Sequence, residues 1–206
     1  MKKRPYCDDF LRLLSPHFEI VMFTASLAKY AQPLFNRLDP TGTLIDHVLF
    51  REHCTLVQNE YYVKDMARLG RPLESTIIID NSPASYLFQP ENALPCISWY
   101  TDPQDLELSV FIPILLKIAQ QQKDVREILR LILKKGNKLD MNRVKTLLGF
   151  DAVTQVNNLS KRYEPQTVES SPGSRSSKYN SNHIRNSSQK IKNRETPAGL
   201  PSTPKP

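Results

Sequence analysis

The hydrophobic positions of this chain gather in short runs that end abruptly in polar residues. The run IVMF at residues 20–23 stops at Thr24, and an amphipathic stretch begins at Leu27 and continues to about Leu38. This pattern predicts a buried strand that leads directly into a helix. The β-branched run STIIID at residues 75–80 predicts a second strand, buried on both faces.

Further stretches extend this alternation of strands and helices. Strands are predicted at residues 47–50, 55–57, 61–63 and 94–99, and helices near residues 5–15, from Asp102 onward, at 125–135 and at 141–148. Pro113 falls inside the helix that starts near Asp102, so it is expected to bend or divide that helix. Buried strands that alternate with helices predict an α/β fold with a parallel sheet.

Composition separates the chain into three parts. Apolar residues become sparse after about residue 157, so burial cannot offset the cost of ordering that segment. We expect a globular domain at residues 1–118, a basic helical extension at 119–150 and a disordered tail, rich in Ser, Asn, Pro and Lys, at 151–206. No apolar run approaches the ~20 residues that span a membrane, so no span is expected, and the nucleus or the cytoplasm is favoured.

Charge is distributed unevenly along the chain, whose net charge is +7. Residues 1–116 hold 10 Lys and Arg against 14 Asp and Glu, whereas residues 117–145 hold 9 against 3. A basic second half is compatible with RNA, an acidic protein partner or nuclear import, or with a helix face and a tail that are simply solvated. No aromatic residue is interleaved with the basic residues of 117–145, so nucleic-acid binding is the least favoured of these.

The cysteines carry little sign of special chemistry. Cys7, Cys54 and Cys96 show no Cys-x-x-Cys spacing, which indicates neither a zinc site nor a disulfide framework. They are expected to be small core residues in a reducing compartment.

Three predicted strand ends bear polar residues that suit phosphate chemistry. The Thr24 hydroxyl can bind a phosphate oxygen, and the Lys64 ammonium can neutralise phosphate charge. Asp80 and Asn81 offer oxygen ligands to Mg²⁺. Each residue also has an ordinary interpretation, as a helix cap, a solvated lysine or a turn residue, and these alternatives stay open on the residues alone.

Several longer motifs resemble one family closely. They include KRPYCDDFLRLL at residues 3–14, FTASLAKYA at 23–31, YYVKDMARLGR at 61–71 and IIIDNSPASY at 77–86. Together they resemble the small protein phosphatases that act on the RNA polymerase II C-terminal repeat, and their Dullard-like relatives, within the haloacid dehalogenase superfamily. The resemblance covers residues 2 to about 118.

The resemblance implies a Rossmann-like parallel sheet with flanking helices and Mg²⁺-dependent dephosphorylation of phosphoserine and phosphothreonine through an aspartyl phosphate. It also implies a phosphorylated protein as substrate and roles for seven residues. These are Thr24 and Lys64 as phosphate-binding residues, Asp80 and Asn81 at the metal, and Arg51, Leu27 and Tyr30 as substrate-binding residues. The resemblance also implies that Asp80 positions Lys64.

One feature of the family is missing from this sequence. Family members begin with a buried central strand that ends in Asp-x-Asp, where the first Asp attacks phosphorus and the second is the general acid and base. No Asp-x-Asp follows a predicted strand here, and the adjacent Asp8 and Asp9 lie on a predicted helix. We therefore expect the first central strand to be absent, its two neighbours to have open edges and the chain as given to be inactive.

Two functional hypotheses follow from these observations. In the first, the chain is a protein serine/threonine phosphatase of this family whose sequence lacks its first segment. In the alternative, it is a non-catalytic phosphopeptide-binding or scaffold protein, with a protein partner on the basic helix or the tail. The two differ in whether a restored Asp-x-Asp strand would produce phosphatase activity.

Overall fold

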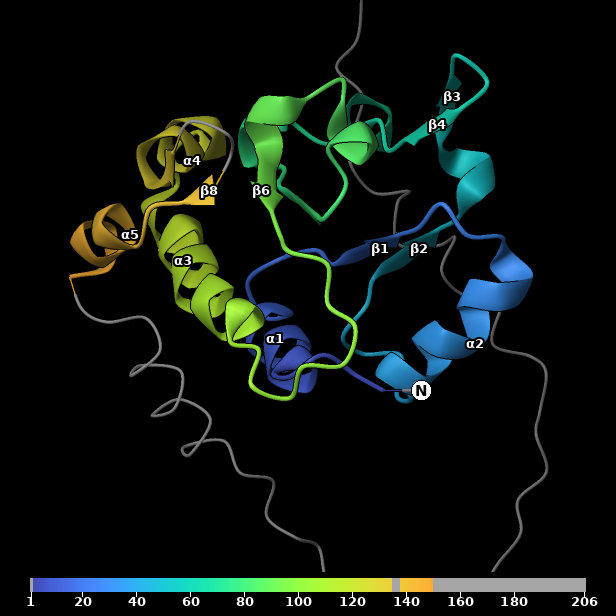
Figure 1. Cartoon of the computed structure of the whole chain (residues 1–206), viewed down its shortest axis with the longest axis horizontal. Helices are drawn as coiled ribbons and strands as arrows, with labels where there is room; N and C mark the ends of the chain where they lie inside the picture. The colour runs from blue at the N-terminus through green and yellow to red at the C-terminus, as the bar shows by residue number, and fades with distance from the viewer. Residues whose placement is uncertain (1, 135–137, 150–206) are drawn as a thin grey trace, which may run out of the picture. The chain divides into compact units, whose positions relative to one another are not determined.

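The computed structural model describes residues 2–134 and 138–149, which belong to one compact unit that extends from Met1 to Pro165. The second unit, Gln166–Pro206, and the whole predicted tail at 151–206 lie outside the described residues. The helices are α1 (Cys7–Leu14), α2 (Ala28–Leu38), α3 (Glu107–Gln121), α4 (Val125–Ile132) and α5 (Met141–Leu148). The strands are β1 (Val21–Phe23), β2 (His47–Leu49), β3 (Thr55–Val57), β4 (Tyr61–Val63), β5 (Ile78–Asp80), β6 (Ala93–Pro95), β7 (Leu133–Lys134) and β8 (Lys138–Leu139) (Figure 1).

The strands form pairs, two parallel and two antiparallel. β1 runs parallel to β2 with Val21 opposite His47, and β5 runs parallel to β6 with Ile78 opposite Ala93. β3 with β4, and β7 with β8, are antiparallel hairpins. A mixed α/β fold with parallel pairing is therefore confirmed. Within the described residues the two parallel pairs do not join into one sheet, and β1 and β5 each have one open edge.

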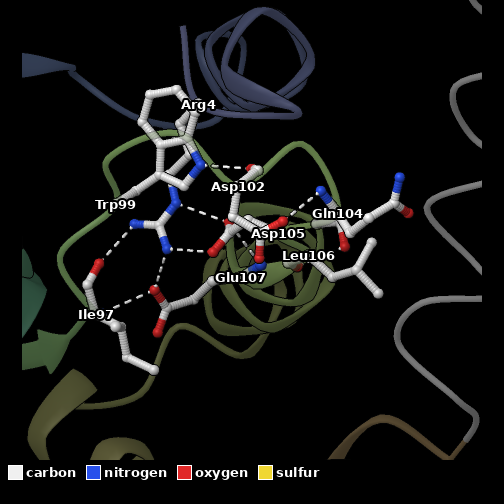
Figure 2. A network of polar contacts seen from close by, with 9 residues as sticks. Arg4, Ile97, Trp99, Asp102, Gln104, Asp105, Leu106 and Glu107 are labelled. Carbon is white, nitrogen blue, oxygen red and sulfur yellow. Dashed lines mark hydrogen bonds and ion pairs between the residues drawn. The ribbon is translucent and has the colours of Figure 1, made fainter.

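Two predicted strands are shorter than the sequence suggested. The strand predicted at 75–80 is confined to Ile78–Asp80, because Ser75 and Thr76 close a short 3-10 helix with hydroxyl groups that donate to the Pro72 carbonyl. Its isoleucines are half-buried rather than buried on both faces. The strand predicted at 94–99 stops at Pro95, because side chains rather than another strand bind the backbone of Ile97 (Figure 2).

The long helix also differs from its prediction. α3 begins at Glu107 rather than near Asp102, because the Asp102 carboxylate accepts a bond from the Gln104 N–H in a separate turn. Pro113 does not divide α3, which continues through it with the proline buried. α4 ends at Ile132 rather than Lys135, since the chain becomes extended at Leu133 to enter the β7–β8 hairpin.

The main core lies between the helices and one parallel pair. α1 packs against α3, and α5 packs against both α3 and α4. The carboxylates of Asp124 and Asp140 cap the N-termini of α4 and α5, as their positions before amphipathic runs would suggest. The buried apolar residues of this core are Leu14, Leu94, Val110, Phe111, Ile114, Leu115, Ile118, Val125, Ile128, Leu129, Ile132, Val144 and Leu148. The segment after residue 118 thus shares the core of the preceding residues.

Among residues 2–134 and 138–149, none of the helices combines the length and the apolar character needed to cross a bilayer.

Candidate functional site

An ion pair between Lys64 and Asp80 forms the centre of the candidate site. Lys64 directly follows β4, Asp80 is the last residue of β5, and Lys64 Nζ donates to Asp80 Oδ2 over 2.5 Å. Both side chains are largely buried, with 11% and 8% of their surface exposed. The second oxygen, Asp80 Oδ1, accepts from the Ser82 N–H at 2.8 Å, and the Lys64 N–H donates to the Ser85 carbonyl. The ends of two separate strands are therefore joined as the sequence analysis expected.

Thr24 lies at the end of β1, in the turn that leads to α2. Its N–H donates to the Leu49 carbonyl and so extends the pairing of β1 with β2. Its hydroxyl oxygen accepts from the Ser26 N–H at 3.1 Å, which leaves the hydroxyl hydrogen available for an acceptor. The residue at the N-cap of α2 is Leu27, so Thr24 does not cap that helix. The capping interpretation is therefore wrong for Thr24.

Cys54 connects the Thr24 turn with the ion pair. Its thiol lies 4.0 Å from the Thr24 carbonyl oxygen and 3.9 Å from that of Phe50. Burial raises the pKa of the Cys54 thiol, while the positive charges of Lys64 and Arg51 lower it in part. Cys54 thus lies within electrostatic reach of both cationic residues. The sequence analysis missed this position, because a lone cysteine gives no sign of its neighbours.

Arg51 supports the turn that contains Thr24. Its Nε donates to the Ala25 carbonyl at 2.6 Å, and its backbone N–H donates to the Ser26 carbonyl at 3.1 Å. The guanidinium carbon lies 4.8 Å from the centre of the Tyr62 ring, a cation–π distance. Arg51 therefore has a structural role at this turn, and its position beside Thr24 is compatible with substrate contact.

Leu27 and Tyr30 form an exposed apolar surface at the start of α2. They are 38% and 64% exposed, and they are three residues apart, so they lie on one side of the helix. The Lys29 ammonium lies 4.9 Å from the centre of the Tyr30 ring. This surface follows Thr24 directly in the chain and is open to an extended peptide.

Asn81 fits the chemistry of a magnesium ligand. Its Nδ2 donates to Ser98 Oγ at 2.8 Å, and its Oδ1 accepts no hydrogen bond from the part of the chain that the structure describes. Both oxygens of Asp80, by contrast, are already engaged. Among the described residues no three His, Cys, Asp or Glu side chains are grouped closely enough to hold a metal. The amide oxygen of Asn81 therefore has the chemistry of one Mg²⁺ ligand.

A cavity of about 990 Å³ lies along the ion pair and the two unpaired strand edges. All of β1 lines it, as do residues 77–80 at β5, and the helices α1 and α3 contribute Phe10 and Leu115. Lys64 and Asp80 also line this cavity. The sequence pointed to this cavity only indirectly, because it lacks an Asp-x-Asp strand that would lie between the neighbouring strands.

The chain was compared with known proteins. The profile of the family described as "NLI interacting factor-like phosphatase" matches residues 1–126. The "Probable C-terminal domain small phosphatase" of Dictyostelium discoideum is 55% identical over 127 residues, which are 62% of this chain and 40% of that protein. The human "Carboxy-terminal domain RNA polymerase II polypeptide A small phosphatase 2" is 54% identical over 117 residues, which are 57% of this chain and 42% of that protein.

A solved structure is also similar to the chain, at lower identity. It is "The Structure of Fcp1, an essential RNA polymerase II CTD phosphatase", with 21% identity and a TM-score of 0.42 over 79% of this chain and 50% of that one. The chain spans about 40% of the length of the curated relatives described above. On the match over residues 1–126 and this identity, the chain belongs to the NLI interacting factor-like phosphatase family, of the haloacid dehalogenase superfamily.

Proposed function

We propose that this chain supplies the phosphate- and substrate-binding part of a phosphatase domain that acts on phosphoserine or phosphothreonine in proteins. The observation that carries this proposal is the buried Lys64–Asp80 ion pair at the cavity wall, in a member of this family. The phosphorylated C-terminal repeat of RNA polymerase II is the first substrate to test, because the human relative is named for that polypeptide. Of the two locations expected from the sequence, the nucleus and the cytoplasm, action on this substrate would require the nucleus.

The proposed roles follow from the geometry around the ion pair. Lys64 compensates the charge of the phosphate, and Asp80 holds the Lys64 ammonium in one position. Thr24 donates its free hydroxyl hydrogen to a phosphate oxygen. Leu27 and Tyr30 contact an apolar or proline residue of the peptide. Asn81 would be one ligand of Mg²⁺, which when bound supplies positive charge for the phosphate oxygens.

We further propose that the cavity receives one more strand, parallel to β1 and β5. Among the described residues β1 and β5 each pair on one side only and both line this cavity, so the N–H and C=O groups of their open edges offer hydrogen-bond partners to such a strand. A strand that ends in Asp-x-Asp would present its carboxylates beside Lys64. The first carboxylate would attack phosphorus while the second protonates the departing serine or threonine oxygen, and the second would then deprotonate the water that releases phosphate.

A grafted strand tests this proposal. A family-type strand with Asp-x-Asp-x-Thr is joined ahead of the full chain, and phosphate release from a phosphoserine peptide is followed with Mg²⁺. We expect activity in the graft and none in the chain as given or in a graft whose first Asp is replaced by Asn. A folded graft that binds the peptide without releasing phosphate would contradict the catalytic proposal.

Phosphopeptide binding without catalysis is the second candidate function. It is favoured by Thr24 and Lys64, which need no nucleophile to bind phosphate. A titration of the full chain with matched phosphorylated and unphosphorylated peptides tests it, with Lys64→Ala as the site variant and Lys123→Ala as the control outside the site. Equal affinity for the two peptides would remove this function.

A further inference from the structure

Arg4 holds a segment that is more than ninety residues away in the chain. Its Nε and Nη2 each donate to one oxygen of the Asp105 carboxylate at 2.8 Å, and Nη2 also donates to Glu107 Oε2 at 2.6 Å (Figure 2). Its third nitrogen, Nη1, donates to the Ile97 carbonyl at 2.9 Å. The side chains of Arg4, Asp105 and Glu107 are all largely buried. Such two-pronged, charge-assisted bonds fix geometry more strictly than exposed ion pairs do.

The same network binds both backbone groups of Ile97. Arg4 binds the Ile97 carbonyl, while the Ile97 N–H donates to Glu107 Oε2 at 2.8 Å. Arg4 and Glu107 are also bonded to each other, so Arg4, Glu107 and the Ile97 backbone form a closed ring of hydrogen bonds (Figure 2). Ile97 is not part of a strand, and its side chain is exposed. Its backbone is therefore fixed by these two side chains rather than by apolar packing or a sheet.

The next residue, Ser98, is the partner of Asn81. Asn81 Nδ2 donates to Ser98 Oγ at 2.8 Å, which orients the amide so that its nitrogen is engaged and its oxygen is free among the described groups. Asn81 is exposed, so packing contributes little to its orientation. One further bond ties this segment to β5, because the Cys96 N–H donates to the Asp80 carbonyl.

We propose that Arg4 is a positioning residue for Asn81, acting through the backbone of Ile97 and the hydroxyl of Ser98. The ring of Arg4, Glu107 and Ile97 sets where Ser98 lies, and Ser98 sets which way the Asn81 amide oxygen points. The inference rests on the proposed function only in what the oxygen is for, namely a Mg²⁺ ligand. We call the contacts that lead from Arg4 through Ile97 and Ser98 to Asn81 the relay, and they are present in the metal-free chain.

A lysine cannot replace Arg4 in this role. The guanidinium has five N–H groups in a planar fork and here binds three different acceptors, whereas an ammonium is a compact point charge without that fork. Arg4→Lys therefore keeps the charge and loses the geometry. Arg71→Lys is the matched control, because Arg71 makes a similar two-pronged bond to Glu19 in an exposed pair.

The relay is tested by NMR on the ¹⁵N-labelled full chain, with the side-chain amide signals of Asn81 as the readout. Without metal, Ser98→Ala should move these two signals to the positions of a free asparagine, and Ser98→Thr, which keeps the hydroxyl, should leave them in place. Arg4→Lys should move them in the same direction as Ser98→Ala, and Arg71→Lys should not. Unmoved Asn81 signals in Arg4→Lys would overturn the relay.

A second variant of the ring and a Mg²⁺ titration complete the test. If Arg4→Lys loses its folded spectrum, Glu107→Gln weakens the same ring with a milder change, and unmoved Asn81 signals in that variant would equally overturn the relay. Mg²⁺ alone is then titrated into the Asp-x-Asp graft and into the same graft with Ser98→Ala, where we expect about tenfold weaker binding in the variant. A graft whose Asn81 signals ignore Mg²⁺ contradicts the metal role of Asn81, while the metal-free spectra still decide the relay.

Discussion

Lys64 and Asp80 form a buried ion pair, with Lys64 Nζ 2.5 Å from Asp80 Oδ2, although Lys64 follows β4 and Asp80 ends β5, which belong to different sheets. No direct backbone pairing joins β4 to β5. The link instead runs through the 3-10 helix at Pro83–Tyr86, where the Lys64 N–H binds the Ser85 carbonyl and the Asp80 carboxylate binds the Ser82 N–H. The short connection after β5 thus brings the two charges together.

Removing one partner of this pair should destabilise the protein. Asp80→Asn leaves the Lys64 ammonium buried without its counter-charge, and such changes cost about 3–5 kcal/mol. The free energy of unfolding in urea measures the loss. The double variant Lys64→Met with Asp80→Asn should recover part of it, because no unpaired charge remains. A loss no larger than that of Lys123→Ala would contradict the burial of the pair.

Asp39 should make stability depend on acid pH. Burial alone would raise the pKa of Asp39, but hydrogen bonds from the N–H groups of Leu44, Ile45 and Thr43 and from the Thr41 hydroxyl outweigh it and lower the pKa to about 2. A lowered pKa favours the folded state above the ordinary value of 3.8, and this contribution is lost as the pH falls from there to about 2.

The measurement compares wild type with Asp39→Asn. We expect the wild type to be the more stable of the two at pH 6 and the difference to shrink below about pH 4, as the Asp39 carboxylate is protonated. Thermal unfolding of wild type and Asp39→Asn, recorded at pH 6 and again below about pH 4, gives the difference in stability between the two proteins at each pH. A difference that is constant across this range would show that the carboxylate charge is not what stabilises the 39–45 turn.

The buried face of α4 should contribute strongly to the stability of the main core. Ile128 in α4 is 2% exposed, so Ile128→Ala should cost about 2–5 kcal/mol of unfolding free energy. Leu131 lies on the same helix at 64% exposed, and Leu131→Ala should change stability by less than about 0.5 kcal/mol. Chemical denaturation of both variants is the measurement, and similar losses for the two would contradict the burial of Ile128 in the main core.

The exposed surface on α2 should contribute to peptide affinity and not to folding. Tyr30→Ala should weaken phosphopeptide binding by about 1–2 kcal/mol, in the range of interface tyrosines, with little change in unfolding free energy. Leu131→Ala removes another exposed apolar side chain and serves as the control. Calorimetric titration with a phosphoserine peptide followed by an apolar residue measures the effect. Unchanged affinity in Tyr30→Ala would place the peptide elsewhere.

Local sequence patterns predicted most elements because their signals are contained within a few residues. The hairpin at 55–63 and the helix at 141–148 have the expected bounds. The predicted bounds are wrong where side chains bind backbone groups that would otherwise belong to a strand or a helix. Residues 96–99 are not a strand because Arg4 and Glu107 bind the Ile97 backbone, and α3 starts late because Asp102 and Asp105 bind nearby N–H groups in turns of their own.

The sequence by itself determined the family and the types of residue that bind phosphate, because those motifs are contiguous and depend on local chemistry. It named Thr24, Lys64, Asp80 and Asn81, and the family resemblance implied that Asp80 positions Lys64. Only the tertiary structure showed the geometry of that ion pair, the bond from Asn81 to Ser98 and the cavity that both β1 and β5 line. The two side-chain bonds join residues that are 16 and 17 positions apart. They are set by how the helices and strands pack, which no local pattern records.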